Sequence, residues 1–150
     1  MKRIGLISAA CAAVLAVSAI ALGAQGSKTY KARLAPVPLD AQLSQVVSGL
    51  GSATATLSGN TLTVNGTFDG LKSPATIAQI HKAQRGVRGP VVFDLKVTAN
   101  GMGGTIAGSL TLTPQQIADL DKSWFYIQLH SEKAPDGNLW GWLMPQETKK

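Results

Sequence analysis

The chain has only two imidazoles, His81 and His130, and they are its first candidates for metal chemistry. A redox or hydrolytic metal centre needs three or more dependable protein ligands. The only thiol, Cys11, lies in the apolar N-terminal segment, and Met102 and Met144 have no recognisable ligand spacing. We therefore expect no resident metal or cofactor. We expect both histidines to lie on polar strand faces and to form hydrogen bonds across a gap.

Motifs of the other common catalytic classes are absent from the sequence. It has no Gly-x-Ser-x-Gly nucleophile elbow and no phosphate-cradling glycine loop. Asp119 and Asp121 resemble a carboxylate pair, but they fall at the end of a short predicted helix, where exposure to solvent is the ordinary state. A Ser–His–Asp triad is recognised by geometry and stays open. We expect a protein that is not an enzyme.

The strongest candidates for binding are Trp140, Trp142 and Met144 in the last alternating segment. Alternation puts Leu139 and Leu143 on one strand face and these three residues on the other. If the leucines face the core, the three form a partner-binding surface for a protein or a glycan. The alternative is that residues 34–38, or a neighbouring strand, cover them.

Charged residues give no sign of a nucleic-acid partner. Lys82, Arg85 and Arg88 form a loose basic group among glycines, and no concentrated basic stripe is present. A solvated loop is the interpretation that this pattern favours.

Period-two alternation positions these residues and dominates the chain from residue 39. Turn residues such as Ser58-Gly59-Asn60 and Asn100-Gly101 separate the alternating segments. This pattern predicts an all-β fold, an antiparallel Greek-key-like β-sandwich of about seven to eight strands. The expected strands cover residues 41–47, 52–57, 61–68, 75–81, 90–97, 105–112, 124–130 and 138–143. The expected core contains Leu62, Val64, Ile80, Phe93, Leu95, Ile127, Leu129, Leu139 and Leu143.

One short helix interrupts the strands. Thr113 can cap it, Pro114 suits its first position, and Gln116 can complete a capping box. These residues predict a helix over 113–121.

The N-terminal segment has the three parts of a secretory signal peptide. Lys2 and Arg3 precede an uncharged apolar run over residues 4–22, and small residues precede Ala24. A retained membrane anchor is the alternative, because the run approaches the ~20 residues of a membrane span. We predict a signal peptide over 1–23 and a periplasmic or secreted protein with no stable membrane span after its removal.

The remaining chain is predicted to contain one domain. We expect an extended N-terminal segment over 24–38, the domain over 39–145 and a polar tail over 146–150. Without Lys2 and Arg3, twelve basic residues remain against eight acidic ones, a net charge near +4. No cysteine remains after residue 11, so the domain cannot use disulfides.

A set of short motifs occurs along the chain in a fixed order. The set comprises Leu71, Ser73-Pro74-Ala75, Ile80-His81, Gly89-Pro90-Val91-Val92, Leu112-Thr113, Leu120, Tyr126, Leu129-His130, Pro135, Gly137 and Gly141-Trp142-Leu143. No single element is specific, but the ordered set resembles the CHRD domain, the module named after chordin, over roughly residues 39–145. The resemblance implies an exported all-β binding domain without established enzymatic activity, whose partner here is an unidentified extracytoplasmic protein or glycan.

The chain departs from the family pattern at polar positions. Members commonly show His-x-His in the first motif, where this chain has Gln79-Ile80-His81. Their ending often reads Gly-Glu-Ile-Arg-Gly-Gln-Leu, and here tryptophans occupy two of its positions. A copper-binding or superoxide-dismutase-like protein that uses His81 and His130 remains the alternative function.

The signal segment leads to the first testable prediction. The exported protein should begin near Ala24 and lie outside the cytoplasm, because the apolar run is followed by small residues that suit cleavage. Intact mass of the exported protein measures its N-terminus. A membrane-bound species that retains residues 1–23 would show that the segment is an anchor.

Overall fold

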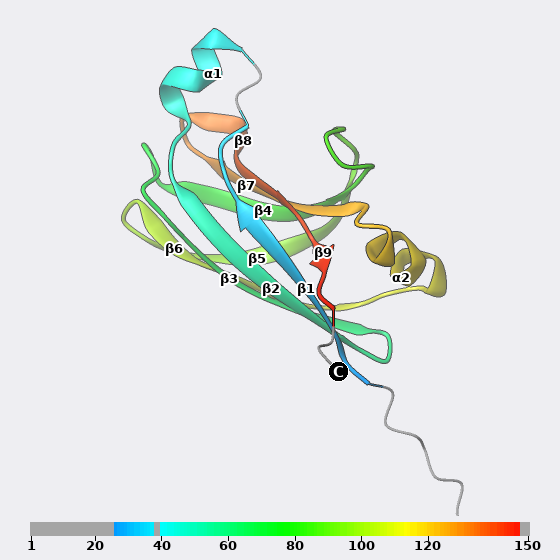
Figure 1. Ribbon diagram of the computed structural model, residues 1–150. Helices are drawn as coiled ribbons and strands as arrows, with labels where there is room; N and C mark the ends of the chain where they lie inside the picture. Colours follow the sequence, from blue (N-terminus) through cyan, green and yellow to red (C-terminus); the bar gives the residue numbers. More distant parts are fainter. Residues whose placement is uncertain (1–25, 38–39, 148–150) are drawn as a thin grey trace, which may run out of the picture.

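The structure, a computed structural model, describes residues 26–37 and 40–147, which form one nine-stranded sheet and two short helices (Figure 1). The predicted signal peptide, residues 1–23, lies outside the described residues. The elements are β1 (Lys28–Leu34), α1 (Ala41–Val46), β2 (Leu50–Ser58), β3 (Thr61–Asp69), β4 (Ala75–Lys82), β5 (Val91–Asn100), β6 (Gly103–Thr111), α2 (Pro114–Asp121), β7 (Phe125–Ser131), β8 (Ala134–Trp142) and β9 (Met144–Pro145).

The sheet is antiparallel throughout, with strand order β8-β7-β4-β5-β6-β3-β2-β1-β9. Strands β4, β5 and β6 follow one another as hairpins, and the chain then returns through α2 so that β7 lies beside β4. This is a Greek-key connection. Ala35, just after β1, exchanges two backbone hydrogen bonds with Trp140 of β8, at 3.0 and 2.9 Å. The sheet therefore curls into a nearly closed barrel (Figure 1).

The all-β, antiparallel, Greek-key-like prediction is confirmed, but a sandwich of seven to eight strands is wrong. Nine strands form one curled sheet because the segment predicted as merely extended, 24–38, contributes β1, and Met144–Pro145 adds β9. β1 pairs along its full length with β2, so the folded unit begins before residue 39. Alternation alone does not separate the two architectures, because sandwiches and barrels both bury one face of each strand.

The strand predicted over 41–47 is also wrong, because these residues form helix α1. The Asp40 side chain accepts a hydrogen bond from the Leu43 backbone N–H at 2.8 Å and caps the helix. None of the six residues of α1 is buried. Small and polar residues here happen to alternate, and the capping signal outweighs that period.

The predicted core is confirmed for eight of its nine members, which are buried; Phe93 is partly buried and packs edge-on against Phe125 with centroids 6.4 Å apart. Val91 does not share the face of Phe93, although simple alternation would put it there. The register slips between Ile80 and His81, so Val91 lies opposite His81 and is 45 % exposed. A β-bulge of this kind moves one residue to the other face of its strand.

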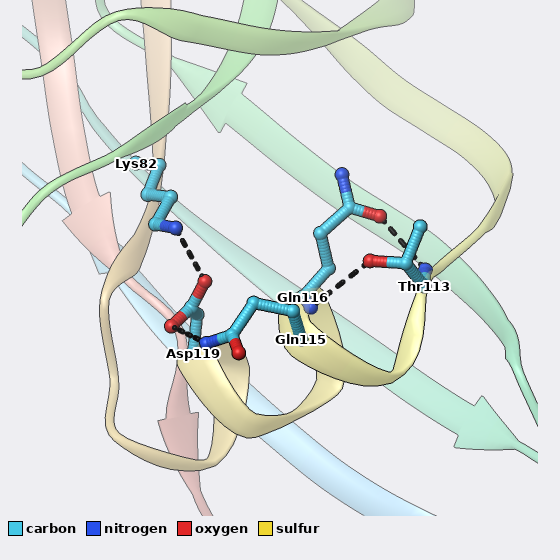
Figure 2. A network of polar contacts seen from close by, with 5 residues as sticks. All are labelled: Lys82, Thr113, Gln115, Gln116 and Asp119. Atoms are coloured by element: carbon cyan, nitrogen blue, oxygen red, sulfur yellow. Dashed lines mark hydrogen bonds and ion pairs between the residues drawn. The ribbon is translucent and has the colours of Figure 1, made fainter.

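The helix predicted over 113–121 is confirmed as α2, with its capping box (Figure 2). Thr113 Oγ1 accepts from the Gln116 N–H at 3.2 Å, and the Gln116 side chain accepts from the Thr113 N–H at 2.8 Å. Leu120 is fully buried and anchors the helix to the barrel.

The prediction that Asp119 of α2 is exposed is wrong. Its side chain is buried and lies 2.5 Å from Lys82 Nζ of β4, and Gln115 Nε2 donates to it at 3.1 Å (Figure 2). The bond from Lys82 is the main reason that the pKa of Asp119 is lowered, against the opposing effect of burial. Asp121 is part-exposed and accepts hydrogen bonds from Lys28 and from the Tyr30 hydroxyl.

The ion pair of Asp119 leads to the second prediction. At pH 7, Asp119→Asn should lower the free energy of unfolding by about 1–3 kcal/mol, because a buried, charge-assisted contact is lost. A folded-state pKa below the ordinary value of about 4 means that the pair stabilises above that pH, and that its contribution disappears as the pH falls through the folded-state pKa. The difference in the free energy of unfolding between the unchanged protein and Asp119→Asn should therefore become smaller in acid.

Lys28→Met is the matched control, because Lys28 pairs with the part-exposed Asp121 and its own side chain is 58 % exposed. It should cost at most about 1 kcal/mol. Urea unfolding of the three proteins at several pH values measures both effects. Equal losses in the two variants would contradict a structural role for the Lys82–Asp119 pair.

Candidate functional site

Five aromatic and imidazole side chains gather on the outer face of three neighbouring strands. They are His81 of β4, Tyr126 and His130 of β7, and Trp140 and Trp142 of β8, and we call them the aromatic face. Tyr126 lies opposite His81 in one direction and opposite Trp142 in the other. The residues that alternate with them point into the core, so the strand period puts each of the five on the outer face, and the pairing of β4, β7 and β8 brings them together.

Tyr126 occupies the centre of the aromatic face. Its ring is stacked on His81 at 5.0 Å and on Trp140 at 5.5 Å, with interplanar angles of 17° and 14°, and it lies 4.9 Å from Trp142. The His130 ring lies 6.4 Å from that of His81. Stacked contacts of this kind hold the rings in a fixed arrangement.

Gly89 ties the connection between β4 and β5, residues 83–90, to the aromatic face. Its N–H donates to the Tyr126 hydroxyl at 3.0 Å, and its carbonyl accepts from His81 Nδ1 at 2.9 Å. A Cβ at this position would lie 1.9 Å from the Lys82 carbonyl oxygen. Only glycine allows the backbone to approach so closely.

Arg88 is the second contact from this connection. Arg85 and Arg88 are exposed there, as predicted for a solvated loop, whereas Lys82 lies in β4 and pairs with Asp119. The Arg88 guanidinium lies 5.0 Å from the centroid of the Trp140 ring, and its Nη2 donates to the Asp136 carbonyl at 2.9 Å. The side chain remains exposed, so it adds a positive charge at the surface of the aromatic face.

The β7–β8 hairpin holds His130. His130 Nδ1 donates to the Pro135 carbonyl at 2.7 Å, and Gln128 donates to the Asp136 carbonyl at 2.6 Å. Gly137 has φ +123°, and a Cβ there would lie 2.3 Å from Gln128 Nε2, so the turn requires glycine. Burial lowers the pKa of His130, which keeps the imidazole neutral near pH 7.

Both histidines form hydrogen bonds, as predicted, but each bonds to a backbone carbonyl, and their predicted place on polar strand faces is wrong because both are buried among aromatic rings. The structure also brings the two residues together. Among the described residues, no group of three or more His, Cys, Asp or Glu side chains could hold a metal. Gln79, which stands where the family pattern has its first histidine, donates instead to Asp94 at 2.8 Å. A superoxide-dismutase-like centre is therefore not supported.

The predicted partner surface is more covered than the alternation suggests. Leu139 and Leu143 are buried as expected, but Trp140 is only 4 % exposed, and Trp142 and Met144 are half-buried. The extension of β1 pairs with the Trp140 backbone, whereas Tyr126 and Arg88 contact its ring. A partner-binding role for the three residues stays a prediction.

A model of the CHRD domain matches residues 33–143, from the end of β1 to the residue after β8. The chain belongs to the CHRD domain family. The resemblance inferred from the ordered motifs is thereby confirmed. No curated protein and no solved structure is significantly similar to the chain. In the described part of this CHRD domain protein, no helix has the length and apolar character that crossing a membrane requires.

No pattern in the sequence of this CHRD domain groups Tyr126, Arg88 and Gly89 into one site. Gly89-Pro90 carries a signal, because glycine beside proline marks a backbone constraint. The contact between Arg88 and Trp140 carries none, because 52 positions separate them in the sequence.

The burial of Trp140 leads to the third prediction. Trp140→Ala should lower the free energy of unfolding by about 3–5 kcal/mol, because a buried indole and its stacking on Tyr126 are lost. Leu50→Ala, at a side chain that is 57 % exposed, is the control and should change stability by about 0.5 kcal/mol or less. Denaturant unfolding measures both. A Trp140→Ala variant as stable as the control would show that the indole is not part of the packed structure.

Proposed function

We propose that this CHRD domain protein is an exported, non-enzymatic binding module that docks an extracytoplasmic protein on its aromatic face. The observation that carries the proposal is a fixed stack of aromatic rings with a surface arginine, bordered by exposed aliphatic side chains. Arg88 is exposed at the edge of this stack, and Arg is one of the residue types that dominate binding energy at protein interfaces.

Exposed aliphatic residues border the aromatic face. Ile77 of β4 is 49 % exposed and alternates with core residues, so it points outward four residues before His81. Val91 is 45 % exposed opposite His81, and Val87 is 54 % exposed beside Arg88. An exposed apolar border around ordered aromatic rings is typical of an interaction surface.

The same geometry favours a protein over a glycan. A sugar ring that stacks on an indole needs an open indole face, and Trp140 is 4 % exposed beneath Arg88. Aliphatic side chains offer a sugar no hydrogen bonds, but they fit apolar side chains of a protein. Exposed Arg85 and Arg88 favour a partner with acidic residues, because complementary charge speeds association.

Two further observations support export and the lack of catalysis. The family is one of exported binding domains by the resemblance stated above, and residues 1–23 have the pattern of a signal peptide. Each described residue of the aromatic face has a packing or hydrogen-bonding role, and none pairs a nucleophile with a base.

The fourth prediction tests the docking face directly. A photo-cross-linking amino acid at Ile77 or Val91, introduced in the producing organism, should give one discrete adduct with an extracytoplasmic protein. The matched controls are the same amino acid at Leu50 and at Thr63, which are exposed on strands far from β4 and β7 in the sheet order. They should give no such adduct.

Identification of the adduct by mass spectrometry allows a second step with purified partner. Val91→Asp should weaken binding at least 10-fold, because a charge then meets an apolar contact, while Leu50→Asp should leave binding unchanged. Adducts of equal yield at all four positions, or binding insensitive to Val91→Asp, would contradict the proposed face.

A further inference from the structure

Four buried polar atoms of the aromatic face have no hydrogen-bond partner: Nε2 of His81, Nε2 of His130, and Nε1 of Trp140 and of Trp142. The one other such atom in the described part of the chain, Asp119 Oδ2, forms the ion pair with Lys82. Leaving a buried polar atom unpaired is costly, and such atoms concentrate where a ligand, an ion or a water binds.

The tautomer of each histidine follows from its partner. His81 Nδ1 faces the Gly89 carbonyl and His130 Nδ1 faces the Pro135 carbonyl, at 2.9 and 2.7 Å. A carbonyl can only accept, so each Nδ1 carries a hydrogen, and a ring that holds one hydrogen presents a lone pair at Nε2. Metal-ligating histidines are oriented in the same way, by donating their other ring N–H to a carbonyl or a carboxylate.

The spacing of the rings suits two nitrogens on one ion. The ring centroids lie 6.4 Å apart, with an interplanar angle of 31°. Two nitrogens that bind one metal from opposite sides are about 4 Å apart, at about 2.0 Å each. Because Nε2 lies away from the centre of its ring, two facing Nε2 atoms at this separation place the ring centroids farther apart than the nitrogens, as the 6.4 Å between the centroids is.

The surroundings select the kind of ion. Zinc and divalent copper need three or four ligands, and among the described residues no third His, Cys, Asp or Glu joins the pair. The positive charge of Arg88 lowers the pKa of His130, and the negative charge of Asp136 raises it, so the two charges oppose each other at this ring. Monovalent ions with a filled d shell accept two imidazoles in a near-linear arrangement and tolerate this low negative charge.

Burial would also protect such an ion. His81 and His130 are each 8 % exposed, and Tyr126 and the indoles cover the same face. We propose that His81 and His130 form a two-imidazole site for a monovalent metal ion, Cu⁺ or its analogue Ag⁺. The site binds and shields the ion without turnover, and it does not depend on the protein partner proposed above.

Ag⁺ is the probe, because it does not change oxidation state in air. The exported protein should carry Cys11→Ser, so that no thiol is present whether or not residues 1–23 remain. After desalting, it should retain one Ag⁺ per chain. His81→Gln and His130→Gln should each weaken binding by more than the roughly 10–100-fold lost when only a ligand's hydrogen-bond partner is removed.

Met102→Leu and Met144→Leu are controls for binding of Ag⁺ by a methionine thioether. Both variants should keep one Ag⁺ per chain. Zn²⁺ should not be retained, because two ligands do not satisfy it. Titration of Cu⁺ without oxygen, against a competing chelator, should give the same pattern across the variants.

A second readout holds even if a histidine variant fails to fold. In the protein with both histidines, the ¹⁵Nε2 signals of His81 and His130 should both show coupling to silver, while both Nδ1 atoms stay protonated. No retained Ag⁺, coupling at only one ring, or loss of the ion in Met144→Leu would overturn the proposal. If no Ag⁺ is retained, ordered water and not a metal ion is the partner of the two Nε2 atoms.

Discussion

Closure of the sheet between β1 and β8 stabilises both the core of the barrel and the aromatic face outside it. Two backbone hydrogen bonds join Ala35 to Trp140, and Gly141 lets the strands meet, because a Cβ there would lie 2.5 Å from the Arg33 carbonyl oxygen. The closure seals Leu34, Leu139 and the other core residues from water. It also fixes the backbone of the residue whose ring lies against Tyr126, so the barrel and the aromatic face share one support.

The aromatic face combines two kinds of surface. Outside, exposed aliphatic side chains and Arg88 offer apolar contact and charge to a partner. Inside, two lone pairs and two indole N–H groups lie buried without hydrogen-bond partners. Gln79, at the position where members of the family commonly have a histidine, donates to Asp94. His81 and His130 are therefore the two imidazoles of this inner surface.

Local patterns allowed the strands, the core and α2 to be predicted, because alternation and capping act over a few residues. Leu62 and Val64 follow from the period alone. The joining of β1 to the sheet, the bulge at Val91 and the burial of Asp119 against Lys82 depend on residues far apart in the sequence. The same applies to the site: alternation put Trp140 and Trp142 on one face, but only the folded chain shows Arg88 over one of them.

The aromatic face is fixed before any ligand arrives, and the Nε2 atoms of both histidines have no hydrogen-bond partner. Nitrogen-resolved NMR of the ligand-free protein distinguishes the two tautomers of each imidazole ring. We expect His81 and His130 both to be protonated at Nδ1, and the Trp140 indole N–H to exchange slowly with solvent. A ring whose single hydrogen is at Nε2, or fast exchange of that indole, would show that the face is not fixed in this form.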